Sequence, residues 1–327
     1  MVDDLSNAVC AGSKTAIARA LNLVEDRREA SRGEVAALLD TLARAPRAEG
    51  GHRIGLTGPP GVGKSSLAAV LARSLRALGR TVGVVAVDPT SVRSGGSLLG
   101  DRARMAFDPA DAGLFVRSLA TAGDAGGLSY AANAAVRVLA AAFDVVLVET
   151  TGVGQTETDV EHVADTVALV VQPGSGDVLQ FLKAGIMEIP DVIVVNKADH
   201  AELARRTVSD LRGALASARA AGITEREVAI VATSARDATG IDELVTALDT
   251  HRAELDGEPL EERRLRGAVA WTLGLVRRAH GEHGVTGLGG AGALRARIDR
   301  DLRGDSSPLA LSSALGLEYL SNVRAPH

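Results

Sequence analysis

The sequence predicts an α/β fold in which helices cover both faces of a mostly parallel, doubly wound sheet. Two observations lead to this prediction. First, short β-branched runs alternate with segments of helical periodicity between residues 52 and 250. Second, the runs are almost continuously apolar, as expected of strands buried on both faces by crossover helices. They are residues 54–57, 81–87, 143–149, 167–172, 192–196 and 228–233.

Helical segments are expected on both sides of this region. Residues 1–50 predict an N-terminal helical extension with two amphipathic helices between about 12 and 47, and Ser31 and Glu34 have the spacing of a capping box at the second. Residues 257–327 predict a charged helical arm, which the glycine-rich stretch 284–292 interrupts. The α/β domain that contains the predicted sheet lies between these two helical segments and is expected to span residues 51–256.

Composition narrows the function classes. The chain is 46% apolar but only 2% aromatic, so Ala, Leu and Val must fill the core. A net charge of −5 argues against a dedicated binder of nucleic acid or anionic membranes, which would carry a basic surface. The single cysteine, Cys10, allows no internal disulfide. Without a signal-like start or an apolar run near the ~18 residues of a membrane span, a cytoplasmic location is expected.

The segment 52–75 reads as a strand, a glycine-rich loop and a helix. Gly58, Gly63, Lys64 and Ser65 fit the phosphate-loop (P-loop) pattern G-x-x-x-x-G-K-[ST] in the context that this pattern requires. Backbone N–H groups of such a loop surround the β-phosphate, and the helix start adds its positive dipole end. Lys64 is expected to reach the β- and γ-phosphates as a catalytic cation. The expected nucleotide contacts are Gly58, Gly61, Val62, Gly63, Lys64, Ser65 and Ser66.

A magnesium site is expected beside this loop, because the Ser65 hydroxyl is the usual metal ligand of a P-loop. The run 143–149 should pair with the P-loop strand and ends at Glu149, where many P-loop NTPases have the aspartate of Asp-x-x-Gly. Glu149 is therefore a predicted magnesium and catalytic residue. Further on, Gln155 could orient the attacking water, although a solvent-facing glutamine fits the sequence equally well.

Two more carboxylates are magnesium candidates. Asp88 follows the run 81–87 at the carboxyl end of a strand, which is the functional edge of a doubly wound sheet. Asp101 follows a glycine-containing segment that could fold over the metal. Each is expected to contact Mg²⁺ directly or through a water, and helix capping or surface solvation is the alternative.

A guanine site is predicted where the run 192–196 ends. Asn196, Lys197 and Asp199 form the Asn-Lys-x-Asp pattern. A carboxylate here accepts hydrogen bonds from N1–H and the 2-amino group of guanine, and adenine offers no such pair. Ser234 and Ala235 resemble the segment whose backbone N–H meets the guanine 6-oxo group. Together with the P-loop, these residues predict GTP and GDP as ligands, with Mg²⁺.

At this level of detail the chain resembles the MeaB/ArgK family of GTPases. The segments that carry the resemblance are TGPPGVGKSSL, VDPTSVRSGGSLLGDRARM, FDVVLVETTGVGQTE, PGSGDVLQFLKAGIMEIPDVIVVNKAD and TSARDATGIDEL, with weaker similarity in AIARALNLVED and RRLRGAVAWTLGLV. The resemblance implies a GTPase chaperone that gates cofactor loading and protection of adenosylcobalamin-dependent methylmalonyl-CoA mutase or a related acyl-CoA mutase. It also implies a homodimer formed through the C-terminal arm, and no nucleic-acid or membrane partner is expected.

Two other classes remain as alternatives. One is a transport-associated kinase or ATPase of the arginine-ornithine type, although Asn196 and Asp199 argue against ATP. The other is a metal-delivery GTPase, which would need soft ligands near its mobile loops. Cys10 stands alone, and His280 and His283, one helical turn apart, fit a solvent-facing pair at a helix end better than a metal site.

Overall fold

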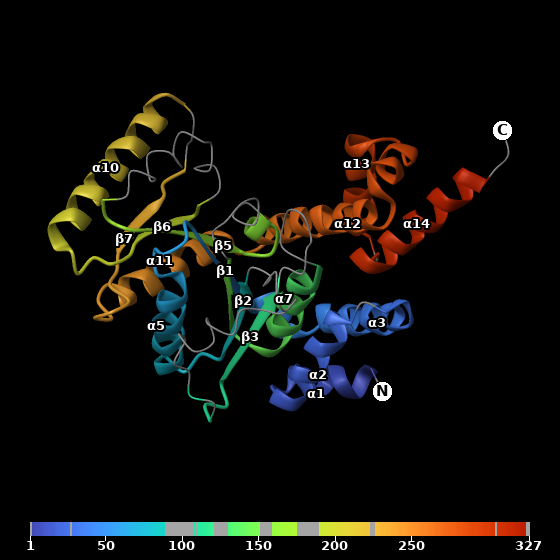
Figure 1. Cartoon of the computed structure of the whole chain (residues 1–327), viewed down its shortest axis with the longest axis horizontal. Helices are drawn as coiled ribbons and strands as arrows, with labels where there is room; N and C mark the ends of the chain where they lie inside the picture. Colours follow the sequence, from blue (N-terminus) through green and yellow to red (C-terminus); the bar gives the residue numbers. More distant parts are fainter. Residues whose placement is uncertain are drawn as a thin grey trace, which may run out of the picture.

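The computed structural model shows one large sheet with helices on both faces and further helices at either end of the chain (Figure 1). It describes residues 2–26, 28–88, 108, 110–120, 130–150, 159–174, 190–222, 226–304 and 306–324.

Among the described residues the sheet has seven strands in the order β3-β2-β4-β1-β5-β6-β7, and every paired register is parallel. The strands are β1 (His52–Thr57), β2 (Val82–Asp88), β3 (Leu114–Ala120), β4 (Val145–Glu149), β5 (Thr166–Val171), β6 (Val192–Val195) and β7 (Ala229–Ala232). Strands β4, β5 and β6 are buried at every residue, which is why the sequence shows them as apolar runs. The predicted doubly wound α/β fold is confirmed.

The strand order reverses at β1, which lies between β4 and β5. In sheets of this kind ligands bind outside the carboxyl ends of the strands at such a reversal. One strand, β3 at the edge of the sheet, was not predicted from the sequence. Its polar Arg117 and Ser118 and its half-buried Phe115 and Val116 break the apolar run that identified the other strands.

Helices cover each face according to the alternation of side chains along the strands. Helices α5 (Lys64–Ala77) and α11 (Ile241–Glu254) pack on the face that presents Ile54, Leu56 and Leu147. Helix α7 (Tyr130–Ala142) packs on the opposite face over Val146 and Val148, and α10 (Ala201–Ala220) covers the same face at β6 and β7. The core therefore consists of two layers, one on either side of the sheet.

The N-terminal segment contributes four α-helices within the described part of residues 2–50; the second and third are the two expected between about 12 and 47, and the other two were not predicted. The four helices are α1 (Val2–Cys10), α2 (Lys14–Glu25), α3 (Arg32–Ala43) and α4 (Pro46–Gly50), and they pack on α7. The expected capping box at Ser31 is wrong. The Ser31 backbone is already helical, and its hydroxyl donates to Asp26 Oδ2 at 2.7 Å instead of accepting from the helix.

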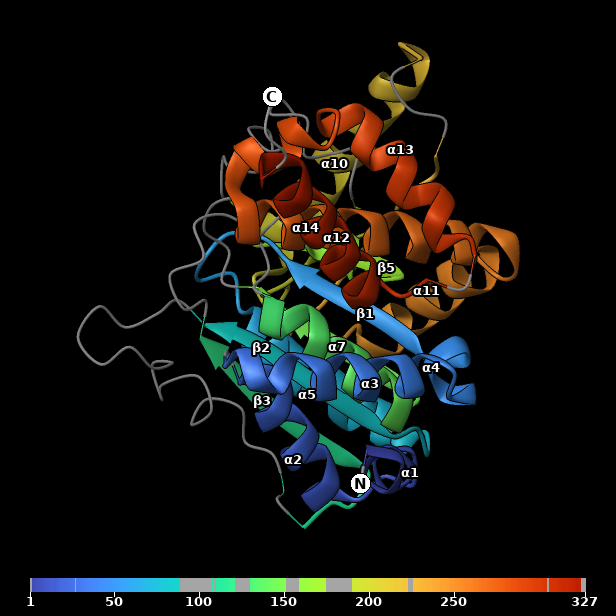
Figure 2. The ribbon, with the colours of Figure 1, turned by 90° about the vertical axis from the view of Figure 1, so that its right-hand side faces the viewer.

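The C-terminal helices form a separate small core. They are α12 (Glu258–Gly287), α13 (Ala291–Leu302) and α14 (Pro308–Arg324), and Figure 2 shows α13 and α14 beside α12, above the N-terminal helices. The predicted glycine-rich break is confirmed, because α12 ends at Gly287 and α13 begins at Ala291. Within the described residues, no helix is both long enough and apolar enough to cross a membrane.

Candidate functional site

The predicted P-loop lies between β1 and α5 at the carboxyl edge of the sheet (Figure 1). Two glycines are required there by close approach. Gly58 has φ 134°, and a Cβ on it would lie 2.1 Å from the Val170 carbonyl oxygen of β5. Gly63 has φ 92°, and a Cβ on it would lie 2.7 Å from Asn196 Nδ2. The loop is therefore packed tightly between β5 and the segment that carries the predicted guanine motif.

Lys64 is the first residue of α5, and its side chain is buried at 6% exposure. Its ammonium donates to the carbonyl oxygens of Gly58 at 2.7 Å and Pro59 at 3.0 Å. The cation is thus held in the mouth of the loop next to the helix N-terminus, where no side chain caps the free N–H groups. This arrangement suits the phosphates of a nucleotide.

Ser65 and Glu149 come together as the sequence predicted. Glu149 ends β4, pairs in register with Leu56 of β1, and is buried. The Ser65 hydroxyl donates to Glu149 Oε1. A hydroxyl and a carboxylate beside a phosphate site are the hard oxygen ligands that Mg²⁺ prefers, so this pair fits the metal. Ser66 is exposed on the next position of α5.

Three other predicted positions cannot be placed in the same way. The backbone of Asp88 ends β2, two residues beyond the Ala86 that pairs with Glu149, but its side chain lies outside the described part of the structure. Asp101 and Gln155 lie wholly outside the described residues. Their proposed roles in metal binding and water activation stay predictions.

Asn196 connects the phosphate and base halves of the site. Its side chain is buried, and Nδ2 donates to the Val62 carbonyl oxygen at 2.9 Å. Its Oδ1 accepts from the backbone N–H of Ala235 at 3.2 Å and from the Thr233 hydroxyl at 3.3 Å. Asn196 therefore ties the P-loop to the loop after β7, and these bonds fix where the Ala235 N–H lies.

Asp199 is held by a neighbour while it keeps access to solvent. Its Oδ1 lies 3.2 Å from the fully buried Ser234 hydroxyl, whose single proton can be donated to it or to Asp237 Oδ2, also at 3.2 Å. The Ser234 oxygen in turn accepts from the Asp237 backbone N–H at 3.2 Å. The Asp199 side chain is 19% exposed, and Arg236 lies 3.6 Å from its Oδ2. Because Arg236 is mostly exposed, this ion pair is screened and weak. The carboxylate is oriented but still accessible to a ligand.

Lys197 has an unusual backbone and two side-chain bonds. Its φ of 61° is left-handed, which is rare for a residue with a Cβ. Its ammonium donates to the Gly61 carbonyl oxygen at 2.7 Å and to Gln172 Oε1 at 2.6 Å. Gln172 was not predicted from the sequence, because nothing in its local pattern distinguishes it from any residue after a strand.

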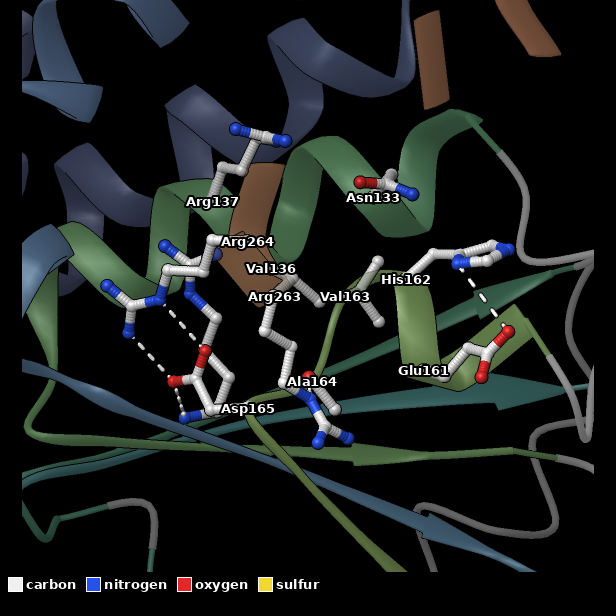
Figure 3. Close-up of a pocket in the computed structure, with 11 residues that line it drawn as sticks. Asn133, Val136, Arg137, Glu161, His162, Val163, Ala164, Asp165, Arg263 and Arg264 are labelled. Atoms are coloured by element: carbon white, nitrogen blue, oxygen red, sulfur yellow. Dashed lines mark hydrogen bonds and ion pairs between the residues drawn. The ribbon is translucent and has the colours of Figure 1, made fainter. Parts of the chain in front are cut away.

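A pocket of about 300 Å³, including the open space at its mouth, lies away from these loops between α7, α12 and the segment before β5 (Figure 3). Arg264 donates to both oxygens of Asp165 at 2.8 and 2.7 Å, and Arg263 donates to Asp191 at 2.7 Å. Arg137 points away from these pairs, over the ring of Trp271 at 4.6 Å. These contacts attach α12 to the amino edge of the sheet.

The residues that a metal-delivery protein would need are not gathered in the described structure. His280 and His283 lie beside the Tyr319 ring of α14, with centroid distances of 5.1 and 6.5 Å. His283 is exposed, as expected, whereas His280 is half-buried. Burial raises the pKa of the Cys10 thiol, which sits in α1. Among described residues no group of three His, Cys, Asp or Glu side chains could hold a metal.

Fold and loop geometry together define a P-loop GTPase, with the phosphate and base motifs on neighbouring loops of one sheet edge. The chain belongs to the MeaB family, since the family model described as "Methylmalonyl Co-A mutase-associated GTPase MeaB" matches residues 17–291. It is accordingly a GTP-hydrolysing enzyme that binds guanine nucleotide.

Individual relatives agree with this assignment. The chain is 43% identical over 273 residues to a protein of Pyrococcus abyssi whose name describes a GTPase, covering 81% of each chain. It is 32% identical over 295 residues to the mouse "Methylmalonic aciduria type A homolog, mitochondrial", covering 86% of this chain and 71% of the relative. The crystal structure of a "LAO/AO transport system kinase" superposes with a TM-score of 0.62 at 26% identity, covering 98% of this chain and 97% of the kinase chain.

Proposed function

We propose that this GTPase is a magnesium-dependent chaperone of an adenosylcobalamin-dependent acyl-CoA mutase, with methylmalonyl-CoA mutase as the leading partner. In this proposal GTP binding and hydrolysis gate the loading and protection of the mutase cofactor. The observation that carries the proposal is the family match over residues 17–291, because the family is described by its association with methylmalonyl-CoA mutase. The name of the mouse relative links it to methylmalonic acid metabolism and adds support.

The site supplies the chemistry that such a switch needs. Lys64 neutralises charge that develops on the transferred phosphoryl group, and the loop N–H groups from Gly61 to Ser66 hold the β-phosphate. Ser65 and Glu149 would hold Mg²⁺, which would supply positive charge to offset that of the phosphates. Asp88 and Asp101 are the further metal candidates, and Gln155 is the candidate for orienting water.

Base recognition is assigned to the loops after β6 and β7. Asp199 reads N1–H and the 2-amino group of guanine, with its carboxylate oriented by Ser234. Asn196 bonds to the P-loop through the Val62 carbonyl oxygen. Lys197, the next residue, reaches from the loop after β6 to the Gly61 carbonyl oxygen of the P-loop. The Ala235 N–H completes the set near the 6-oxo position.

We also propose how the chain is organised around this site. Residues 51–256 form the GTPase domain, residues 1–50 an N-terminal extension, and residues 257–327 an arm through which two copies form a homodimer. Exposed Leu317, Leu320 and Val323 on α14 support an interaction role for the arm. The proposal includes neither nucleic acid nor membrane as a partner and places the protein in the cytoplasm.

The proposal is tested by mixing the purified protein with the adenosylcobalamin-dependent mutase encoded in the same genome. Isolated switch GTPases turn over on the order of 10⁻⁴–10⁻² s⁻¹, and an ordering partner can raise this by several powers of ten. We expect turnover to rise at least about tenfold and complex stability to differ between GDP and a non-hydrolysable GTP analogue. An acyl-CoA enzyme without adenosylcobalamin is the control. No binding and no acceleration under any nucleotide would overturn the chaperone proposal and leave the GTPase assignment intact.

A second candidate is a transport-associated kinase, because the superposed crystal structure is that of a protein named as a transport system kinase. It predicts ATP-dependent phosphorylation of a protein or amino acid and indifference to the mutase. Radiolabelled ATP and GTP in the same mixture separate the two, because only the kinase transfers label to an acceptor other than water.

A further inference from the structure

Lys197 is fixed at its far end by two acceptors from different parts of the fold. One is the Gly61 carbonyl oxygen of the P-loop at 2.7 Å, and the other is Gln172 Oε1 at 2.6 Å. Gln172 follows β5, whereas Lys197 follows β6, and these strands are parallel neighbours. The ammonium therefore joins three neighbouring loops at the carboxyl edge of the sheet.

The position of Gln172 is itself supported. The chain turns two residues later at Gly174, which has φ 75°, and the Gly174 N–H donates to Thr207 Oγ1 of α10 at 3.4 Å. An amide oxygen accepts from an ammonium without cancelling its charge. Gln172 can thus hold the lysine while leaving its positive charge in the nucleotide site.

A lysine side chain loses considerable rotamer freedom when it is fixed, so a free Lys197 would be ordered only when the ligand binds. With both acceptors in place, the apolar stem of Lys197 is already extended from the base loop to the P-loop. Such a stem gives a planar base an apolar surface to lie on while the charged end stays in polar surroundings. Ordering it before binding reduces the entropy lost on binding.

We propose that Gln172 is a positioning residue for guanine-nucleotide binding, which holds the Lys197 ammonium against the P-loop so that the lysine stem is in place beside the base. The inference rests on the proposed base site at Asp199 and Lys197. It assigns Gln172 to affinity for the guanosine part of the ligand, with no role at the phosphates.

The test compares Gln172→Met, which keeps the length and removes the acceptor, with Gln172→Glu, which keeps an acceptor. By isothermal titration we expect Gln172→Met to raise the Kd of GDP and of guanosine by about three- to tenfold, the usual effect of losing one hydrogen bond. Gln172→Glu should restore most of the affinity. Inorganic pyrophosphate with Mg²⁺ should bind Gln172→Met as it binds the original protein. Thr207→Val is the matched control, because it removes the neighbouring bond of the same turn without touching Lys197.

A double-mutant cycle with Lys197→Met decides whether Gln172 acts through the lysine. If it does, adding Gln172→Met to Lys197→Met should change the Kd of GDP by less than about twofold. The inference would be overturned if Gln172→Met raised the Kd of GDP by the same factor with and without Lys197→Met. An unchanged Kd in Gln172→Met alone would also overturn it. Failure of the proposed base site is distinguishable, because the original protein would then bind GDP and ADP equally well.

Discussion

The two edges of the sheet carry polar side chains with opposite arrangements. At the carboxyl edge, Lys64 and Lys197 bond to main-chain oxygens of the P-loop, and Asp199 keeps part of its surface accessible. At the amino edge, Asp165 and Asp191 are buried and bonded to arginine and histidine side chains: Arg264 for the first, and Arg263, Arg226 and His251 for the second. The first arrangement can exchange its internal bonds for bonds to a ligand, whereas the second is complete within the protein.

The amino edge also contains a buried chain of hydrogen-bonding side chains that ends on Asp191. Thr166 Oγ1 lies 2.7 Å from His52 Nε2 and 2.9 Å from His251 Nδ1, and His251 Nε2 lies 3.2 Å from Asp191 Oδ1. Burial, partly opposed by Asp165, lowers the pKa of His52 to about 4. The amino-edge side chains use their hydrogen-bonding groups on one another and so fix how the helices pack on the sheet. Ligand binding and catalysis are expected at the carboxyl edge.

The largest effect that sharpens this comparison is expected at Lys64. Lys64→Ala should lower the GTP hydrolysis rate by about 10³-fold, because a buried charge aimed at the phosphates is lost. The free energy of unfolding should fall by only about 1 kcal/mol, the usual net contribution of an internal hydrogen bond. Rate assays and urea titrations measure the two quantities. Lys14→Ala, whose ammonium bonds the Asp111 carbonyl far from the site, is the control and should keep the rate.

A smaller effect is expected at His52, whose replacement should change how the free energy of unfolding depends on pH. Its folded-state pKa of about 4 lies below the unfolded value of 6.5, so the unfolded chain binds the proton more readily. The stability contribution is complete above pH 6.5 and is lost as pH falls toward 4, by about 3 kcal/mol in all. His52→Gln, which can still bond Thr166, should flatten this part of the stability curve in urea titrations between pH 4 and 7.

The exposed His200 provides the control for that experiment. His200→Gln makes the same exchange at an exposed side chain. If His52→Gln unfolds with the same pH dependence as the original protein, the amino edge does not hold a neutral buried histidine, and the contrast between the two edges fails there.

Sequence and structure agree most closely where a function imposes a local pattern. The loop from Gly58 to Ser66 and the meeting of Ser65 with Glu149 were predictable, because P-loop chemistry requires those residue types at that spacing. Six strands were found from their apolar runs. Strand β3 was missed because, at the sheet edge, its Arg117 faces α2 and bonds Glu25 at 2.8 Å, a contact 92 residues distant in sequence.

The amino-edge pairs and Gln172 escaped prediction for a related physical reason. Arg264 and Asp165 are 99 residues apart, and Arg263 and Asp191 are 72 apart. Neither charge stands out in its own segment, because a surface helix and a strand start commonly carry such residues. Only the tertiary fold shows that they are buried opposite each other. The capping prediction at Ser31 failed because the Ser31 backbone is already helical and its hydroxyl is turned to Asp26.

The central claim is that Asp199, oriented by Ser234, selects guanine at the carboxyl edge. Asp199→Asn tests it most directly, because the amide can donate to the 2-oxo group of xanthine but cannot accept both guanine donors. Isothermal titration with GDP and XDP should show GDP affinity reduced on the order of 10²-fold or more and XDP affinity increased. Unchanged GDP affinity in this variant would contradict the account, because guanine would then be read elsewhere.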